Sequence, residues 1–137
     1  MRLFNEPEGK AYLAKQGVPE SVISKLDLMG FSGIANMLSA VKMAKYYGMT
    51  NKDVLLVVLT DSMELYNTRI DEYRKDFGPF TITDAAEAYA ASLMGESTDN
   101  MLELSEFERK RVHNLKYYTW VEQQGKTYEE ILAQWDD

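Results

Sequence analysis

The sequence predicts an α/β fragment that is mainly helical, with one buried β-strand at about residues 53–60 flanked by helices. Apolar residues recur at helical spacing over most of the chain, whereas residues 54–59 form an unbroken run of valine and leucine. Such a run is typical of a strand buried on both faces of a parallel sheet. A parallel strand needs neighbours for its ladder, and the chain offers no second run of comparable quality. We therefore expect most of that sheet to come from residues outside this sequence, unless the strand pairs with its copy in a dimer.

Helix signals surround the apolar run. The periodicity and the glycine and proline positions predict helices over residues 7–16, 19–26, 32–48, 63–77, 84–94 and 105–124, with another beginning after Thr127. Ser32 is the candidate N-cap of the third of these helices, and Thr83 or Asp84 is the candidate for the fifth.

Two capping boxes mark the helix starts in the final third of the chain. Ser105 with Glu108, and Thr127 with Glu130, have the spacing in which the side chain of each residue reaches the backbone amide of the other. Gly125 is expected to end the first of these two helices.

Length and composition fit one globular domain over residues 1–137, with 45% hydrophobic and 27% charged residues. A net charge of −7, with no basic stripe, argues against nucleic-acid binding. The N-terminal residues lack the apolar core of a signal peptide, and the apolar run is far too short to span a bilayer. We therefore expect a cytoplasmic chain that does not enter membranes. There is no cysteine, so disulfides and thiolate metal sites are excluded.

Few residues have a pattern that indicates chemistry. His113 has no catalytic or metal-ligating spacing around it and is read as structural or exposed. The best-placed polar group is Thr60-Asp61-Ser62, directly after the apolar run, because ligands of open α/β sheets bind beyond the carboxyl ends of strands. The alternative is that Asp61 or Ser62 only caps the next helix. The spacing alone does not favour either reading.

Residues 32–68 resemble the fold-type II enzymes that use pyridoxal phosphate (PLP), a group that includes tryptophan synthase β, cysteine synthase and cystathionine β-synthase. The resemblance is an ordered series: Ser32-Gly33, an alanine-containing helix ending in Lys42-Met43-Ala44-Lys45, the Val/Leu run, then Leu59-Thr60-Asp61-Ser62 and Tyr66-Asn67-Thr68. In the family the corresponding strand ends in Leu-Pro-Asp-Ser, so Thr60 departs from the common proline. By this likeness Ser62 would contact the pyridine nitrogen of PLP, with Thr60 and Asp61 beside it as cofactor-binding residues.

The resemblance implies a C-terminal portion of a PLP-dependent lyase or synthase that acts on amino acids. The Schiff-base lysine and the glycine-rich phosphate cradle of that family lie upstream of the matching region, and nothing in this sequence replaces them. We therefore expect no catalytic residue here and no PLP bound by this chain alone, although the parent enzyme would use it. Expected partners are a second copy or the missing N-terminal PLP-binding part. The alternative is a stand-alone helical protein-interaction module derived from such an enzyme.

Overall fold

The structure is a computed structural model that describes residues 1–135, and within that range it contains helices and no β-strand. The chain divides into two compact units, Met1–Asp99 and Asn100–Asp137, which we call unit 1 and unit 2. The expectation of one domain over residues 1–137 stays a prediction, because two compact units of one chain are compatible with either organisation.

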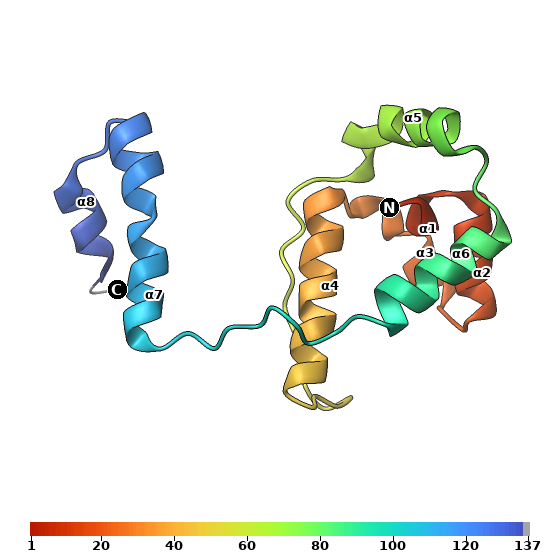
Figure 1. Ribbon diagram of the computed structural model, residues 1–137, viewed down its shortest axis with the longest axis horizontal. Helices are drawn as coiled ribbons and strands as arrows, with labels where there is room; N and C mark the ends of the chain where they lie inside the picture. Colours follow the sequence, from red (N-terminus) through yellow and green to blue (C-terminus); the bar gives the residue numbers. More distant parts are fainter. Residues whose placement is uncertain (136–137) are drawn as a thin grey trace. The chain divides into compact units, whose positions relative to one another are not determined.

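Unit 1 is built from several short helices grouped beside one long helix (Figure 1). The long helix is α4 (Phe31–Tyr46), and a segment without regular secondary structure, residues 53–62, follows it. The remaining elements are α1 (Arg2–Asn5), α2 (Pro7–Lys15), α3 (Glu20–Ile23), η1 (Leu26–Leu28), η2 (Met63–Tyr66), α5 (Asn67–Phe77), α6 (Ile82–Ala88) and η3 (Tyr89–Met94), the last with π-helical hydrogen bonding.

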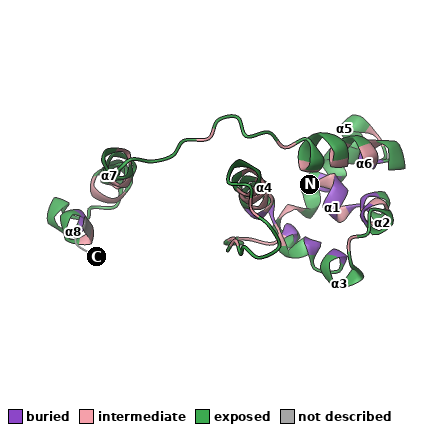
Figure 2. Cartoon of the chain, turned by 90° about the horizontal axis from the view of Figure 1, so that it is seen from below, coloured by how far each residue is buried: buried purple, intermediate pink, exposed green. Residues whose placement is uncertain are grey.

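The core of unit 1 lies among the short N-terminal helices and α6, where the buried residues concentrate in Figure 2. Gly9 of α2 is packed against α1 so closely that an added Cβ would lie 2.2 Å from the carbonyl oxygen of Leu3. Partly buried side chains of α4 and η3 pack against this core. Its buried members are Leu3, Phe4, Leu13, Ile23, Leu26, Phe80 and Ala85.

A buried carboxylate joins three parts of unit 1. Glu6 is 2% exposed and accepts hydrogen bonds from Arg2 Nε at 2.7 Å and from Arg74 Nε and Nη2 at 3.0 and 2.9 Å. Arg2 also donates to the carbonyl of Gly78 at 3.0 Å, and its guanidinium lies 4.9 Å from the centre of the Phe80 ring. The hydrogen bonds to Glu6 and the negative charge of its carboxylate raise the pKa of Arg74 above its ordinary value. The arrangement ties α1 to α5 and to the turn before α6.

Unit 2 is a helical hairpin with little buried apolar surface. It contains α7 (Glu106–Asn114), the π-helical η4 (Tyr117–Gln123), α8 (Tyr128–Leu132) and η5 (Ala133–Trp135). Among its described residues, Ile131 is the one buried hydrophobic side chain. The rings of Tyr117 and Tyr128 lie edge to face at 6.5 Å, and Lys116 Nζ donates to Gln134 Oε1 at 2.8 Å.

Both predicted capping boxes in unit 2 are confirmed, since Ser105 caps α7 with Glu108 and Thr127 caps α8 with Glu130. Hydrogen bonds from the backbone amide and hydroxyl of Ser105 lower the pKa of Glu108. The pKa of Glu130 is lowered mainly by a hydrogen bond from the backbone amide of Thr127 and next by one from the side chain of Lys126. Because the pKa values of these two carboxylates are lower in the folded state, the capping boxes stabilise the fold at pH values above the ordinary carboxyl pKa. That contribution is lost as the pH falls through the lowered values.

The prediction of an α/β fragment with a buried strand at 53–60 is wrong. Residues 53–62 carry no regular secondary structure, and Val54, Leu56 and Val58 are 81%, 96% and 72% exposed. A run of valine and leucine becomes a strand only where neighbouring strands supply a ladder, and no other part of the described chain runs beside it as a strand. The fold of residues 1–135 is therefore all-helical.

The predicted starts of two helices, α4 and α6, are also wrong. α4 begins at Phe31 with Gly30 as its N-cap residue, so Ser32 lies inside the helix and does not cap it. α6 begins earlier than predicted, with Thr81 as the cap and Asp84 as the acidic partner three residues on, so neither Thr83 nor Asp84 is the N-cap. The Thr81 hydroxyl and amide hold the pKa of Asp84 below its ordinary value.

Candidate functional site

The segment 54–59 is the most unusual surface of unit 1. Its side chains alternate, with Leu55 and Val57 half-buried and Val54, Leu56 and Val58 open to solvent. Among the described residues, one hydrogen bond reaches its main chain, from Asn36 Nδ2 of α4 to the carbonyl oxygen of Val58 at 2.9 Å. An apolar segment with exposed side chains and unpaired amides is a template for pairing with another polypeptide.

The segment runs as an extended trace beside α4 (Figure 1). Gly33 of α4 faces it, because a Cβ added there would lie 3.2 Å from Leu59 Cδ2. At the far end, the amide of Gly30 donates to the carbonyl of Asp61 at 2.9 Å, so the start of α4 and the end of the segment are fastened together. One side of the segment is thus held on a helix and the other side is uncovered.

Asp61 is a packing and hydrogen-bonding residue of this junction. Its carboxylate accepts a hydrogen bond from Tyr66 OH and another from Thr60 Oγ1 at 3.2 Å. The bond to Asp61, with partial burial, raises the pKa of Tyr66 above the ordinary tyrosine value. The Tyr66 ring lies edge to face with Phe31 at 4.7 Å, and a Cβ on Gly30 would lie 2.6 Å from Asp61 Oδ1. Asp61 therefore fixes the geometry between the segment and two helices.

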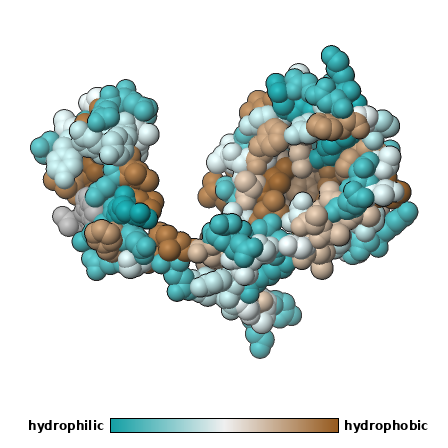
Figure 3. Space-filling model, in the orientation of Figure 1, coloured by the Kyte–Doolittle hydropathy of each residue, from teal (hydrophilic) through white to brown (hydrophobic). Residues whose placement is uncertain are grey.

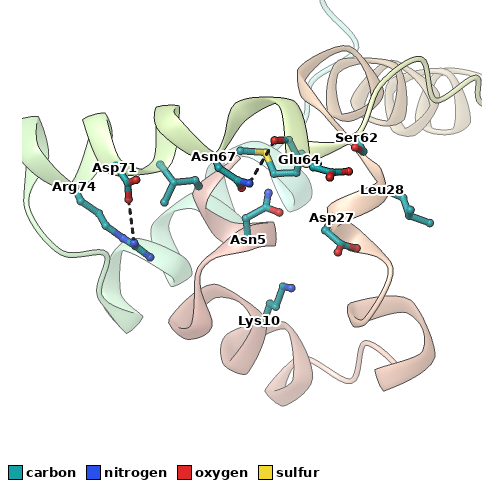
Figure 4. A pocket seen from close by; sticks show the side chains of 11 residues that line it. Asn5, Lys10, Asp27, Leu28, Ser62, Glu64, Asn67, Asp71 and Arg74 are labelled. Atoms are coloured by element: carbon teal, nitrogen blue, oxygen red, sulfur yellow. Dashed lines mark hydrogen bonds and ion pairs between the residues drawn. The ribbon is translucent and has the colours of Figure 1, made fainter.

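The strand predicted before Ser62 is absent; Ser62 itself is the N-cap residue of η2, without a side-chain cap hydrogen bond. It lines a polar cavity of about 540 Å³ between α5 and the N-terminal helices, whereas neither Thr60 nor Asp61 lines it. Figure 4 shows Ser62 and Asn67 on one side of this cavity and Lys10 of α2 on the other. The three residues predicted to act together therefore face different surroundings.

The cavity does not by itself suit an anionic cofactor such as PLP. Three carboxylates line it, from Asp27, Glu64 and Asp71, against two cations, Lys10 and Arg74. Arg74 already forms an ion pair with the buried Glu6, and its Nη1 lies 3.5 Å from Asp71 Oδ1. A phosphate there would meet excess negative charge. The expectation that this chain alone binds no PLP stays a prediction.

The other residues considered from the sequence have structural roles. Lys42 Nζ donates to the carbonyl of Asp99, and Lys45 Nζ donates to those of Met94 and Glu96, each at 2.8 Å. Both lysines thereby hold the end of unit 1 against α4. His113 lies half-buried in α7, in unit 2, while Ser62 lies in unit 1. No group of three potential metal ligands occurs within the described part of the chain.

The role of Gly30, Phe31 and Tyr66 in positioning Asp61 was not predicted from the sequence. A Gly-Phe-Ser-Gly motif stands at this point of the sequence, but its two glycines allow the close approach of residues 59–61 to α4.

A scan of protein-family models, a search of curated proteins and a search of solved structures each found no match. No described helix is long and apolar enough to cross a membrane.

Proposed function

We propose that this chain is the C-terminal segment of a PLP-dependent lyase or synthase acting on amino acids, and that it is not catalytic alone. Its role is structural: it associates with the polypeptide that carries the Schiff-base lysine and the phosphate cradle. The observation that carries the proposal is the segment 54–59, whose backbone amides have no partner among the described residues and whose Val54, Leu56 and Val58 side chains are exposed.

Covering the exposed side chains of Val54, Leu56 and Val58 would stabilise a complex with a second polypeptide. Fully burying a valine or leucine contributes roughly 1.5–3 kcal/mol, so covering three of them contributes about 4.5–9 kcal/mol before the costs of association. A second polypeptide that also supplies hydrogen-bond partners for the amides gains main-chain affinity together with side-chain specificity. The resemblance over residues 32–68 favours the PLP-bearing part of the enzyme as that polypeptide, and it assigns Ser62 to the pyridine nitrogen in the assembled state.

The isolated chain is expected to form no covalent adduct with PLP. One lysine, Lys10, lines the cavity beside Ser62, but the cavity has more carboxylates than cations, and this negative charge disfavours the phosphate of PLP. Titration with PLP followed by borohydride reduction and mass spectrometry tests this expectation. A stoichiometric adduct on one lysine would contradict the proposal, since the chain would then hold the cofactor by itself.

The assembled protein provides the matching test of Ser62. Affinity purification of the full chain from its native cells should yield a second polypeptide whose lysine is the borohydride-fixed position. Ser62→Ala should weaken PLP retention roughly tenfold, as expected for one lost hydrogen bond. Ser39→Ala is the control, because that hydroxyl donates to the carbonyl of Ala35 within α4.

A stand-alone helical interaction module is the second candidate. The all-helical fold and the large exposed apolar surface favour it. A stable complex formed through 54–59 with a protein that contains no PLP would support this candidate over the enzyme segment.

A further inference from the structure

Unit 2 carries an apolar groove to which the proposed function assigns no role. It lies between α7 and α8 and encloses about 630 Å³. Ile131, 1% exposed, forms its floor, and apolar side chains line its rim: Phe107, Leu115, Tyr118 and Tyr128 are 76%, 57%, 57% and 53% exposed. Figure 3 shows apolar surface over this unit among hydrophilic side chains.

A unit of this size does not bury enough apolar surface alone. Domains below about 40 residues usually need a disulfide, a metal or a second chain. Unit 2 spans Asn100–Asp137, the sequence contains no cysteine, and no metal-ligand group occurs in its described part. Four aromatic residues of the groove, Phe107, Tyr117, Tyr118 and Tyr128, are 76%, 38%, 57% and 53% exposed, and aromatic residues are enriched in the cores of protein interfaces. The groove therefore has the aromatic lining typical of an interface.

The charges along α7 indicate which partner covers it. The three charged residues at and before the helix start are acidic: Glu103, Glu106 and Glu108. From residue 109 to residue 121 the charged residues are all basic: Arg109, Lys110, Arg111 and Lys116. If a second α7 lies antiparallel to the first, the acidic start of each helix lies beside the basic end of the other. In a parallel pair, residues of the same charge would lie beside each other and repel.

We propose that two copies of this chain dimerise through unit 2, with their α7 helices antiparallel and the groove of each covered by the aromatic side chains of the other. The product is a twofold-symmetric bundle of helices. Glu106 of each copy then faces Arg111 of the other. The exposed pair of Glu106 with Lys110, at 3.2 Å within one helix, is weak enough to be exchanged for these contacts.

Sedimentation equilibrium of the full chain tests the dimer. The wild type should approach twice 15.7 kDa as its concentration rises. Phe107→Glu should give the monomer, because it buries charge in the groove, and its own fold should persist because Phe107 is 76% exposed. Val112→Glu is the control on the same helix: Val112 is 46% exposed and does not line the groove, so the dimer should remain.

Charge reversal tests the antiparallel arrangement. Glu106→Lys and Arg111→Glu should each raise the dissociation constant at least about tenfold, and the double variant should restore the wild-type value. Leu56→Lys in unit 1 should leave the dimer intact. The proposal is overturned if the wild type stays monomeric, if Phe107→Glu still dimerises, if Leu56→Lys abolishes the dimer, or if the double reversal recovers nothing.

Discussion

Replacing Glu6 by alanine should lower the free energy of unfolding of unit 1 by about 3 kcal/mol, the range for breaking a buried ion pair by removing one partner. Glu6 is 2% exposed, and its carboxylate accepts three hydrogen bonds, one from Arg2 and two from Arg74. Its removal leaves the guanidinium of Arg2, whose side chain is 14% exposed, without its ionic partner. α1, α5 and the turn at Gly78 then lose their common attachment.

The measurement is urea unfolding followed through the amide NMR signals of α1 and α5. Tryptophan fluorescence would not report on this region, because Trp120 and Trp135 both belong to unit 2. Glu72→Ala on α5 is the matched control: Glu72 pairs with Arg69 at 2.6 Å, but both side chains are about half exposed. That change should stay within about 1 kcal/mol. Equal effects of the two substitutions would show that the buried carboxylate has no special role.

Gly9→Ala should destabilise unit 1 by about 2 kcal/mol or more, even though alanine is the better helix former by about 1 kcal/mol. A Cβ at this position would lie 2.2 Å from the carbonyl oxygen of Leu3 and 2.7 Å from its Cα. These are backbone atoms of α1, so relief requires α1 and α2 to move apart rather than a side chain to rotate. The separation would open the core around Leu3, Phe4 and Leu13.

The same NMR-detected unfolding checks this prediction, with Ala14→Gly as the control in α2. Ala14 is exposed, so its replacement should cost only the helix-propensity difference of about 1 kcal/mol. The two substitutions run in opposite chemical directions, yet both should destabilise. If Gly9→Ala were stabilising, the contact between α1 and α2 would not be as close as described.

The parts of the fold that depend on neighbouring residues were predictable from the sequence. The boxes of Ser105 with Glu108 and Thr127 with Glu130 involve residues three positions apart, and both were predicted and found. The cap of α6 was misplaced because Thr83 or Asp84 was predicted as the N-cap residue, whereas the N-cap is Thr81 and Asp84 lies three residues after it. Asp84 is instead the acidic partner of Thr81, a choice that the local spacing does not resolve.

The parts that depend on distant residues were not predictable. Burial of 54–59 was inferred from composition, yet a strand exists only where other strands pair with it, and the described chain provides none. The contact between Glu6 and Arg74 joins positions 68 apart, and neither residue has a local signal for it. The turn of Asp61 toward Tyr66 and Gly30 was not predictable either, because it depends on how the segment returns along α4.

Hydrogen exchange at the amides of residues 54–59 tests the central claim most directly. Their N–H groups have no partner among the described residues, so in the isolated chain they should exchange nearly as fast as in an unfolded peptide, while amides of α4 are protected. In the complex purified with the PLP-bearing polypeptide, the same amides should become protected. Protection of 54–59 in the isolated chain, or unchanged fast exchange in the complex, would contradict the account.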